Sequence, residues 1–168
     1  REYYGLDQHP VKVFETTQML GVVEDDLRDA MGIDTVAVVP PRASFGFRLE
    51  DWKPWRMYDG LEVLVPGGFE FTIDENGATL LYPQGDRTAP PSGHMPKDGY
   101  FFDAIIRQEP LDEDKLDPKD NLEEYGRISD DDVAWFNTAI RGVAGSGRAV
   151  VIKCGAGLGD IATIHRGY

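Results

Sequence analysis

The length, composition and charge of this 168-residue chain exclude several classes of protein. Its hydrophobic fraction of 41% is enough for a buried core and excludes a disordered tail. With 30 Asp and Glu against 17 Lys and Arg, the net charge of −13 has the wrong sign for a protein that binds nucleic-acid phosphates. Apolar runs such as Thr35 to Val39 are far shorter than the roughly 18 residues of a membrane helix, so we expect no membrane partner either.

The cysteine and histidine content bears on compartment and metals. Cys154 is the only cysteine, so one chain can form neither a disulfide nor a zinc site of several thiolates. This content favours a protein of the reducing cytoplasm. His9, His94 and His165 do not pair at the spacing of metal ligands, and we therefore assign no metal.

The first predicted elements are helical. Apolar residues from Val11 to Met31 approximate helical spacing, which we interpret as one helix or as two helices divided near Gly21. Gly32 ends this pattern. The run Thr35 to Val39 is β-branched and apolar on both faces, as expected of a parallel strand covered on both sides. A helix followed at once by such a strand is half of an α/β unit.

The middle of the chain changes to extended spacing, and we predict a β-rich insertion over about residues 61–104. Asp74-Glu75-Asn76-Gly77 is a strong hairpin signal, because Asn-Gly tolerates positive φ. Residues 83–99 are rich in Pro, Gly, Asp and Ser and predict an ordered loop or a mobile lid. Strands are predicted at residues 62–65, 69–73, 78–82 and 100–105.

The last third begins with an acidic connector at about residues 109–130, which is either a solvated linker or a cation site. It lacks the glycine and terminal glutamate of a calcium loop. Ser129 followed by Asp132 predicts a helix N-cap. After that helix, Arg148 to Lys153 predicts a second strand buried on both faces, and another helix begins near Leu158.

Candidate binding residues follow the two buried strands, because ligands of parallel α/β folds bind at the carboxyl ends of the strands. After the first strand come Arg42, Ser44, Phe47 and Arg48. Guanidinium groups clamp carboxylates, which predicts a small acidic ligand. The alternative is that both arginines pair with carboxylates of their own chain.

The second strand leads into Cys154 and Gly155, in a glycine-rich run whose backbone N–H groups could hold an anion. A dinucleotide site requires glycine where Asp160 stands, so the signal for a nucleotide is weak. The alternatives are close strand-to-helix packing for the glycines, and a small buried apolar role for Cys154 instead of a nucleophile.

Two further residues are candidate acid/base groups. His94 lies in the predicted lid, where it could cover a substrate and exchange protons at neutral pH. Asp103 follows three aromatic residues, and burial in such company raises a carboxyl pKa. The alternatives are an exposed bystander for His94 and a turn former for Asp103.

Several short motifs lie along the middle of the chain: Asp59-Gly60, Val65-Pro66, Phe69, Asp74-Glu75-Asn76-Gly77, Pro83-Gln84-Gly85-Asp86, His94-Met95-Pro96 and Gly99-Tyr100-Phe101-Phe102-Asp103. In this order they resemble an atypical branch of the uroporphyrinogen decarboxylase family. The stretches from Leu20 through Asp34 and from Arg148 to Asp160 are compatible with it too, so the resemblance covers most of the chain.

The resemblance implies an α/β fold, with residues 1–168 as a single domain forming the N-terminal part of a (β/α)8 TIM barrel interrupted by the β-rich insertion. It also implies one of two activities. One is decarboxylation of a porphyrinogen without a cofactor, and the other is corrinoid-linked methyl transfer, with zinc held in the remaining half of the barrel. The decarboxylase's arginine motif is absent, and Pro41 replaces the expected aspartate, which favours the methyltransferase branch.

Under this interpretation Arg42 and Arg48 anchor acid groups, Phe47 forms an apolar wall and His94 contacts the substrate from the lid. The expected partners are a small acidic molecule or a corrinoid protein, and a second copy of the chain that closes the unfinished sheet. A non-catalytic binding or assembly domain is the alternative from another functional class.

Overall fold

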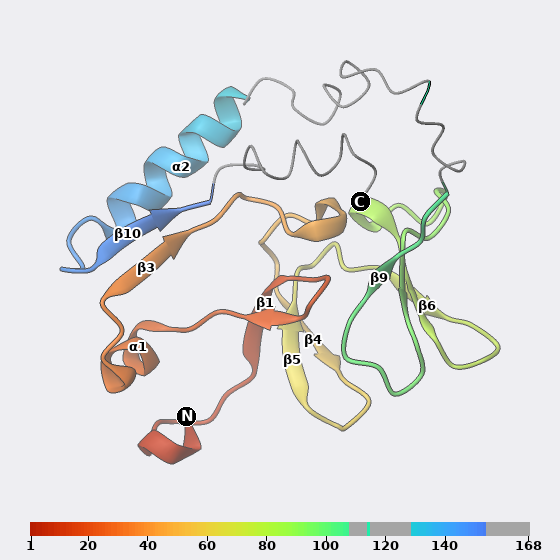
Figure 1. The fold of residues 1–168 in the computed structure, drawn as a ribbon, viewed down its shortest axis with the longest axis horizontal. Helices are drawn as coiled ribbons and strands as arrows, with labels where there is room; N and C mark the ends of the chain where they lie inside the picture. The colour runs from red at the N-terminus through yellow and green to blue at the C-terminus, as the bar shows by residue number, and fades with distance from the viewer. Residues whose placement is uncertain (108–113, 115–128, 154–168) are drawn as a thin grey trace. The chain divides into compact units, whose positions relative to one another are not determined.

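The computed structural model describes residues 1–107, 114 and 129–153 (Figure 1). These residues divide into two compact units. The first unit holds residues 1–34 and 41–106, and the second holds residues 35–40 with the described residues from 107 onward. Cys154, Gly155, the helix expected near Leu158 and nearly all of the acidic connector lie outside the described residues.

The first unit contains a sheet of mixed strand direction. Its strands β1 and β5 are parallel, whereas the two outer pairs are antiparallel. Alternation along the strands places Val13, Val63 and Val65 on the buried side, where each is at most 5% exposed. The strand order is β2 (Leu20–Gly21), β1 (Val11–Glu15), β5 (Glu62–Val65) and β4 (Lys53–Arg56).

A second sheet in the same unit is an antiparallel meander, and its hairpin at residues 74–77 is confirmed. The Asp74 carboxylate accepts hydrogen bonds from the backbone N–H groups of Asn76 and Ala78, and Gly77 has a φ of +83°. The predicted lid contains a short 3-10 helix, η3 (Pro83–Gly85), and a strand of this sheet. The strands are, in order, β6 (Phe71–Ile73), β7 (Thr79–Leu81), β8 (Gly93–Met95) and β9 (Asp103–Ala104).

The core of the first unit is a cluster of aromatic rings around Phe69, which is completely buried. The Phe69 ring centroid lies 5.6 Å from that of Phe47, 5.4 Å from Trp55 and 5.9 Å from Phe102. Trp55 belongs to β4, whereas Phe47, Phe69 and Phe102 come from the β3–β4 loop, the β5–β6 connection and the segment before β9. Edge-on and tilted contacts of this kind hold the two sheets together.

The second unit pairs β3 (Thr35–Val38) with β10 (Ala149–Ile152), and the predicted parallel direction of these strands is confirmed. Figure 1 shows helix α2 (Asp130–Val143) running beside the pair. The Trp135 indole N–H donates to the carbonyl of Val39 at 3.1 Å, and the predicted N-cap is present, with Ser129 accepting from the backbone N–H of Asp132. Neither strand is buried on both faces: β3 alternates, and all four residues of β10 are exposed.

The prediction of an α/β fold that forms part of a (β/α)8 barrel is wrong. The described residues form small sheets of antiparallel and mixed strands with two α-helices, α1 (Asp25–Met31) and α2. A barrel needs parallel strands alternating with helices. Among the described residues only β1 with β5 and β3 with β10 are parallel pairs, and β4 to β9 separate β3 from α2 in the chain. The large core lies instead between the sheets of the first unit.

The sequence predicts helix over residues 11–31, and only residues 25–31 of that range form an α-helix. Helix α1 ends where Gly32 takes a φ of +66°, as expected. Residues 11–15 form strand β1 because Val11 and Val13 favour extended backbone and β1 pairs with β5, a partner far away in sequence. Residues 20–21 form β2 by pairing with β1. Local spacing carries no signal for such a partner.

Candidate cationic cleft

The loop that follows β3 forms a narrow antiparallel turn that holds two arginines opposite each other. Arg42 and Arg48 are partners in an isolated antiparallel bridge. The bridge is bounded by backbone hydrogen bonds from Ala43 to Phe47 at 2.8 Å and from Leu49 to Pro41 at 3.0 Å. A pair placed between two such bonds has closely spaced side chains on one face. Like charges in this position repel, so the fold maintains an unfavourable pairing here.

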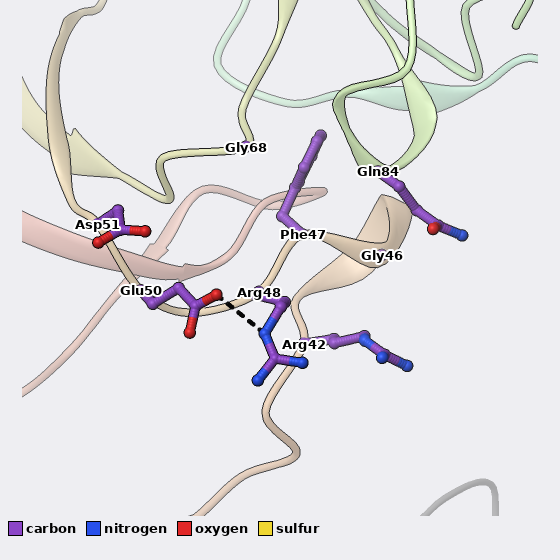
Figure 2. Close-up of a pocket in the computed structure, with 8 residues that line it drawn as sticks. All are labelled: Arg42, Gly46, Phe47, Arg48, Glu50, Asp51, Gly68 and Gln84. Atoms are coloured by element: carbon purple, nitrogen blue, oxygen red, sulfur yellow. Dashed lines mark hydrogen bonds and ion pairs between the residues drawn. The ribbon is translucent and has the colours of Figure 1, made fainter. Parts of the chain in front are cut away.

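The two arginines line an open cleft of about 260 Å³, shown in Figure 2. This volume is slightly below the usual range for drug-sized ligands and suits a small molecule. The cleft lies entirely within the first unit. Its lining comes from the loop after β3, from the β5–β6 turn and from η3, and consists of Arg42, Gly46, Phe47, Arg48, Glu50, Asp51, Gly68 and Gln84.

The two guanidinium groups differ in their partners. Arg48 Nε lies 2.9 Å from a carboxylate oxygen of Glu50, an ion pair drawn in Figure 2. Within the described part of the chain, Arg42 makes no ion pair. Figure 2 shows its side chain extending away from Glu50, with Asp51 on the far side of Glu50. The predicted alternative, pairing with a carboxylate of the same chain, therefore holds for Arg48 and not for Arg42.

The backbone that borders the cleft is strained at several non-glycine residues. Phe45, Asp51 and Gln84 have φ values of +63°, +52° and +54°. Such conformations cost about 1–3 kcal/mol each and cluster at functional sites. Gly46 is required here because its φ is +80° and because an added Cβ would lie 2.7 Å from the Gln84 side chain. The Gln84 side chain lies beside Gly46, as Figure 2 shows.

Ser44 is not part of the cleft lining and instead fastens the arginine loop to β1. Its hydroxyl donates to the Glu15 carboxylate, and its carbonyl accepts a 2.8 Å hydrogen bond from Thr16, which is completely buried. Partial burial acts to raise the pKa of Glu15, but hydrogen bonds from Ser44 and from the backbone of Gln18 and Thr17 outweigh it, and the pKa is lowered. Ser44 therefore has a positioning role.

Phe47 forms part of the cleft lining. Only 1% of its surface is exposed, and its ring packs against Phe45 and Phe69. Figure 2 shows the ring directed away from both arginines. The side chain thus fixes the loop to the aromatic core.

The candidate acid/base residues His94 and Asp103 are brought together, although not at the cleft. They are directly opposite each other in the β8–β9 pair, so both side chains project from the same face of the meander. His94 is half-buried and Asp103 is exposed, and no hydrogen bond joins these two side chains in the described part of the chain. Neither residue lines the arginine cleft.

Sequence reasoning missed Glu50 and Gln84. Glu50 could have been found, because it stands two residues after Arg48 and carries the opposite charge. Gln84 has no local signal, since the tertiary structure brings η3 to the arginine loop. Cys154 and Gly155, the other predicted binding residues, lie outside the described residues.

Comparisons with protein-family models, with curated proteins and with solved structures found no match to this chain. The resemblance to the uroporphyrinogen decarboxylase family therefore stays a prediction. Among residues 1–107, 114 and 129–153, no three His, Cys, Asp or Glu side chains gather as metal ligands would. No helix in the same part of the chain has the length and apolar character to cross a bilayer.

Proposed function

We propose that the cleft between Arg42 and Gln84 binds a small organic acid, and that Arg42 is its main anchor. The observation that carries the proposal is the bridge that holds Arg42 directly opposite Arg48 while Glu50 neutralises only Arg48. A bound carboxylate would relieve the repulsion between the two guanidinium groups and form charge-assisted hydrogen bonds with Arg42.

The rest of the cleft supports a small and polar ligand. Gln84, whose side chain lies against the Gly46 backbone, offers an amide that can donate to a second ligand oxygen. The carboxylates of Glu50 and Asp51 would repel further negative charge on a ligand. These carboxylates therefore favour a ligand with one or two acid groups over a highly charged one.

The resemblance to the uroporphyrinogen decarboxylase family predicts an acidic or corrinoid-linked substrate, and the acid-binding proposal agrees with that class. Methyl transfer remains the favoured activity and decarboxylation the alternative, both untested. Anchoring of a carboxylate by Arg42 is common to both activities and can be tested without assuming either.

The proposal is tested by titrating the protein with succinate and following the backbone amides of residues 42–50 by NMR. We expect Arg42→Gln to weaken binding about fivefold, the upper range for one exposed charge pair. Glu50→Gln should strengthen binding, because it frees the Arg48 guanidinium. Added salt should weaken binding in every variant that retains Arg42.

Two controls make the result specific. Succinamide has nearly the same shape without charge and should not bind, and Arg141→Gln removes an exposed cation of α2 that lines neither this cleft nor another described cavity. Unchanged succinate affinity in Arg42→Gln would remove Arg42 from the site. An equal loss in Arg141→Gln would show that net charge, and not the cleft, attracts the acid.

A further inference from the structure

A second cavity of about 400 Å³ lies in the first unit between β4 and the meander sheet. Its volume falls within the range typical of small-molecule sites. None of its lining residues belongs to the arginine cleft, so the two cavities are separate.

One wall of this cavity follows from strand register. Ile73 pairs with Thr79, and Thr79 pairs with Met95, so these three side chains form a row across β6, β7 and β8 on one face of the sheet. His94 and Asp103 project from the opposite face, because neighbouring residues of a strand alternate. The cavity is therefore distinct from the predicted acid/base pair as well.

The Trp55 ring of β4 packs against this wall. It lies 6.2 Å, edge to face, from the ring of Phe71, which is on the same face of β6 as Ile73, and Trp55 is only partly buried although it packs against the core. Ile73 is 58% exposed beside it. Trp55, Phe71 and Ile73 thus present an apolar surface that a flat or branched hydrocarbon group would cover.

The rim carries positive charge. Lys97 lies in the turn after β8, and the Gly77 backbone allows its stem to lie close, since a Cβ on Gly77 would be 3.1 Å from Lys97 Cδ. Arg56 lies at the end of β4, opposite Glu62 in the neighbouring strand. Neither cation makes an ion pair within the described residues, and Asp98 is the one carboxylate that lines this cavity.

Tyr58 completes the rim as a neutral polar group. Its ring centroid lies 4.7 Å from that of Tyr100. The neighbouring Tyr100 hydroxyl raises the pKa of Tyr58 to about 12, and the phenol is protonated at neutral pH, as an ordinary tyrosine is. A ligand at this rim meets hydroxyl groups and cations, and no phenolate repels its acid group.

We propose that this cavity binds a small carboxylate with an aromatic or branched apolar body, the body against Trp55 and Ile73 and the carboxylate at Lys97. The ligand class follows from an apolar chamber whose rim holds two cations without ion pairs. This site is independent of the arginine cleft and of the function proposed for it.

The test uses 3-phenylpropionate as the probe, with 3-phenylpropanol and 3-phenylpropylamine as analogues of the same shape and different charge. We expect the carboxylate to shift the Trp55 indole signal and the methyl signals of Ile73 and Met95. Trp52 and Trp135 do not line the cavity and serve as internal controls. The alcohol should bind more weakly, and the amine should bind most weakly.

Variants separate the two parts of the site. Lys97→Gln should weaken the carboxylate about two- to fivefold, as expected for an exposed charge pair, and should leave the alcohol unchanged. Ile73→Gln should weaken both, and the exposure of Ile73 makes this substitution tolerable for folding. Arg42→Gln, in the other cleft, should change neither, so that failure of one proposal is distinguishable from failure of the other.

Three outcomes would overturn the proposal. The first is the absence of any Trp55, Ile73 or Met95 shift at about 10 mM probe, a concentration that detects even millimolar binding. The second is equal binding of the three analogues. The third is a shift of the same signals with protein concentration alone, which would mean that a second copy of the chain fills the cavity.

Discussion

The two units differ in how completely they bury their own apolar side chains. In the first unit, two sheets and the connecting loops enclose Phe69, Leu81 and Val65, each completely buried. In the second, α2 covers part of a two-stranded parallel sheet, and Val151 and Ile152 of β10 are 56% and 44% exposed. Parallel sheets are usually covered on both faces. We therefore expect side-chain packing to stabilise the first unit far more than the second.

The largest expected effect is that of Phe69→Ala. Removing a fully buried ring from the centre of the aromatic cluster should lower the free energy of unfolding by about 3–5 kcal/mol. Val151→Ala in β10 should change it by less than about 0.5 kcal/mol, because the side chain is exposed. Thermal unfolding followed by NMR separates the units, with Trp55 reporting on the first and Trp135 on the second. Similar losses of unfolding free energy from both substitutions would contradict the expected difference in packing between the two units.

An intermediate effect is expected at the start of α2. Ser129→Ala removes the acceptor for the Asp132 backbone N–H and should destabilise the helix by about 1 kcal/mol. Ser129→Asn keeps a capping oxygen and is the matched control. The Trp135 signal should respond, since Trp135 joins α2 to Val39. If the unfolding transition reported by Trp55 shifted by the same amount, the two units would unfold together in a single cooperative transition.

The smallest effect is a pH dependence that belongs to the first unit. Glu15 has a folded-state pKa below its ordinary value of 4.5, so its carboxylate stabilises the fold above that value. This contribution is lost as the pH falls from 4.5 through the lower folded pKa. Other carboxylates also titrate there, so the measurement is the difference between the protein and Glu15→Gln in acid unfolding. Identical acid profiles would show that Glu15 contributes nothing.

Much of the local structure could be predicted because its causes are local. The hairpin at Asp74–Gly77, the N-cap at Ser129 and the end of α1 at Gly32 depend on side chains within four residues of the backbone groups they serve. The arginine pair was also found from sequence, as cations in a loop that follows a strand. What sequence reasoning did not supply was the bridge between Arg42 and Arg48, the neutralisation of Arg48 by Glu50, and Gln84 opposite them.

The architecture could not be predicted for a physical reason. Short apolar segments are compatible with several pairings, and only the burial of a common core selects among them. β1 therefore became a strand beside β5 instead of a helix, and the expected barrel proved to be small mixed and antiparallel sheets. The second cavity shows the same point, since Trp55, Ile73 and Lys97 carry no shared motif. They meet because strand register and turn geometry bring them to one place.

The amino-acid sequence alone determined the hairpin turn, the helix ends and the negative charge, because each depends on neighbouring residues or on composition. Tertiary structure decided which strands pair, which of two arginines remains without an ion pair and where apolar surface stays open. Those outcomes depend on contacts between segments far apart in the chain, whose energies no local pattern records.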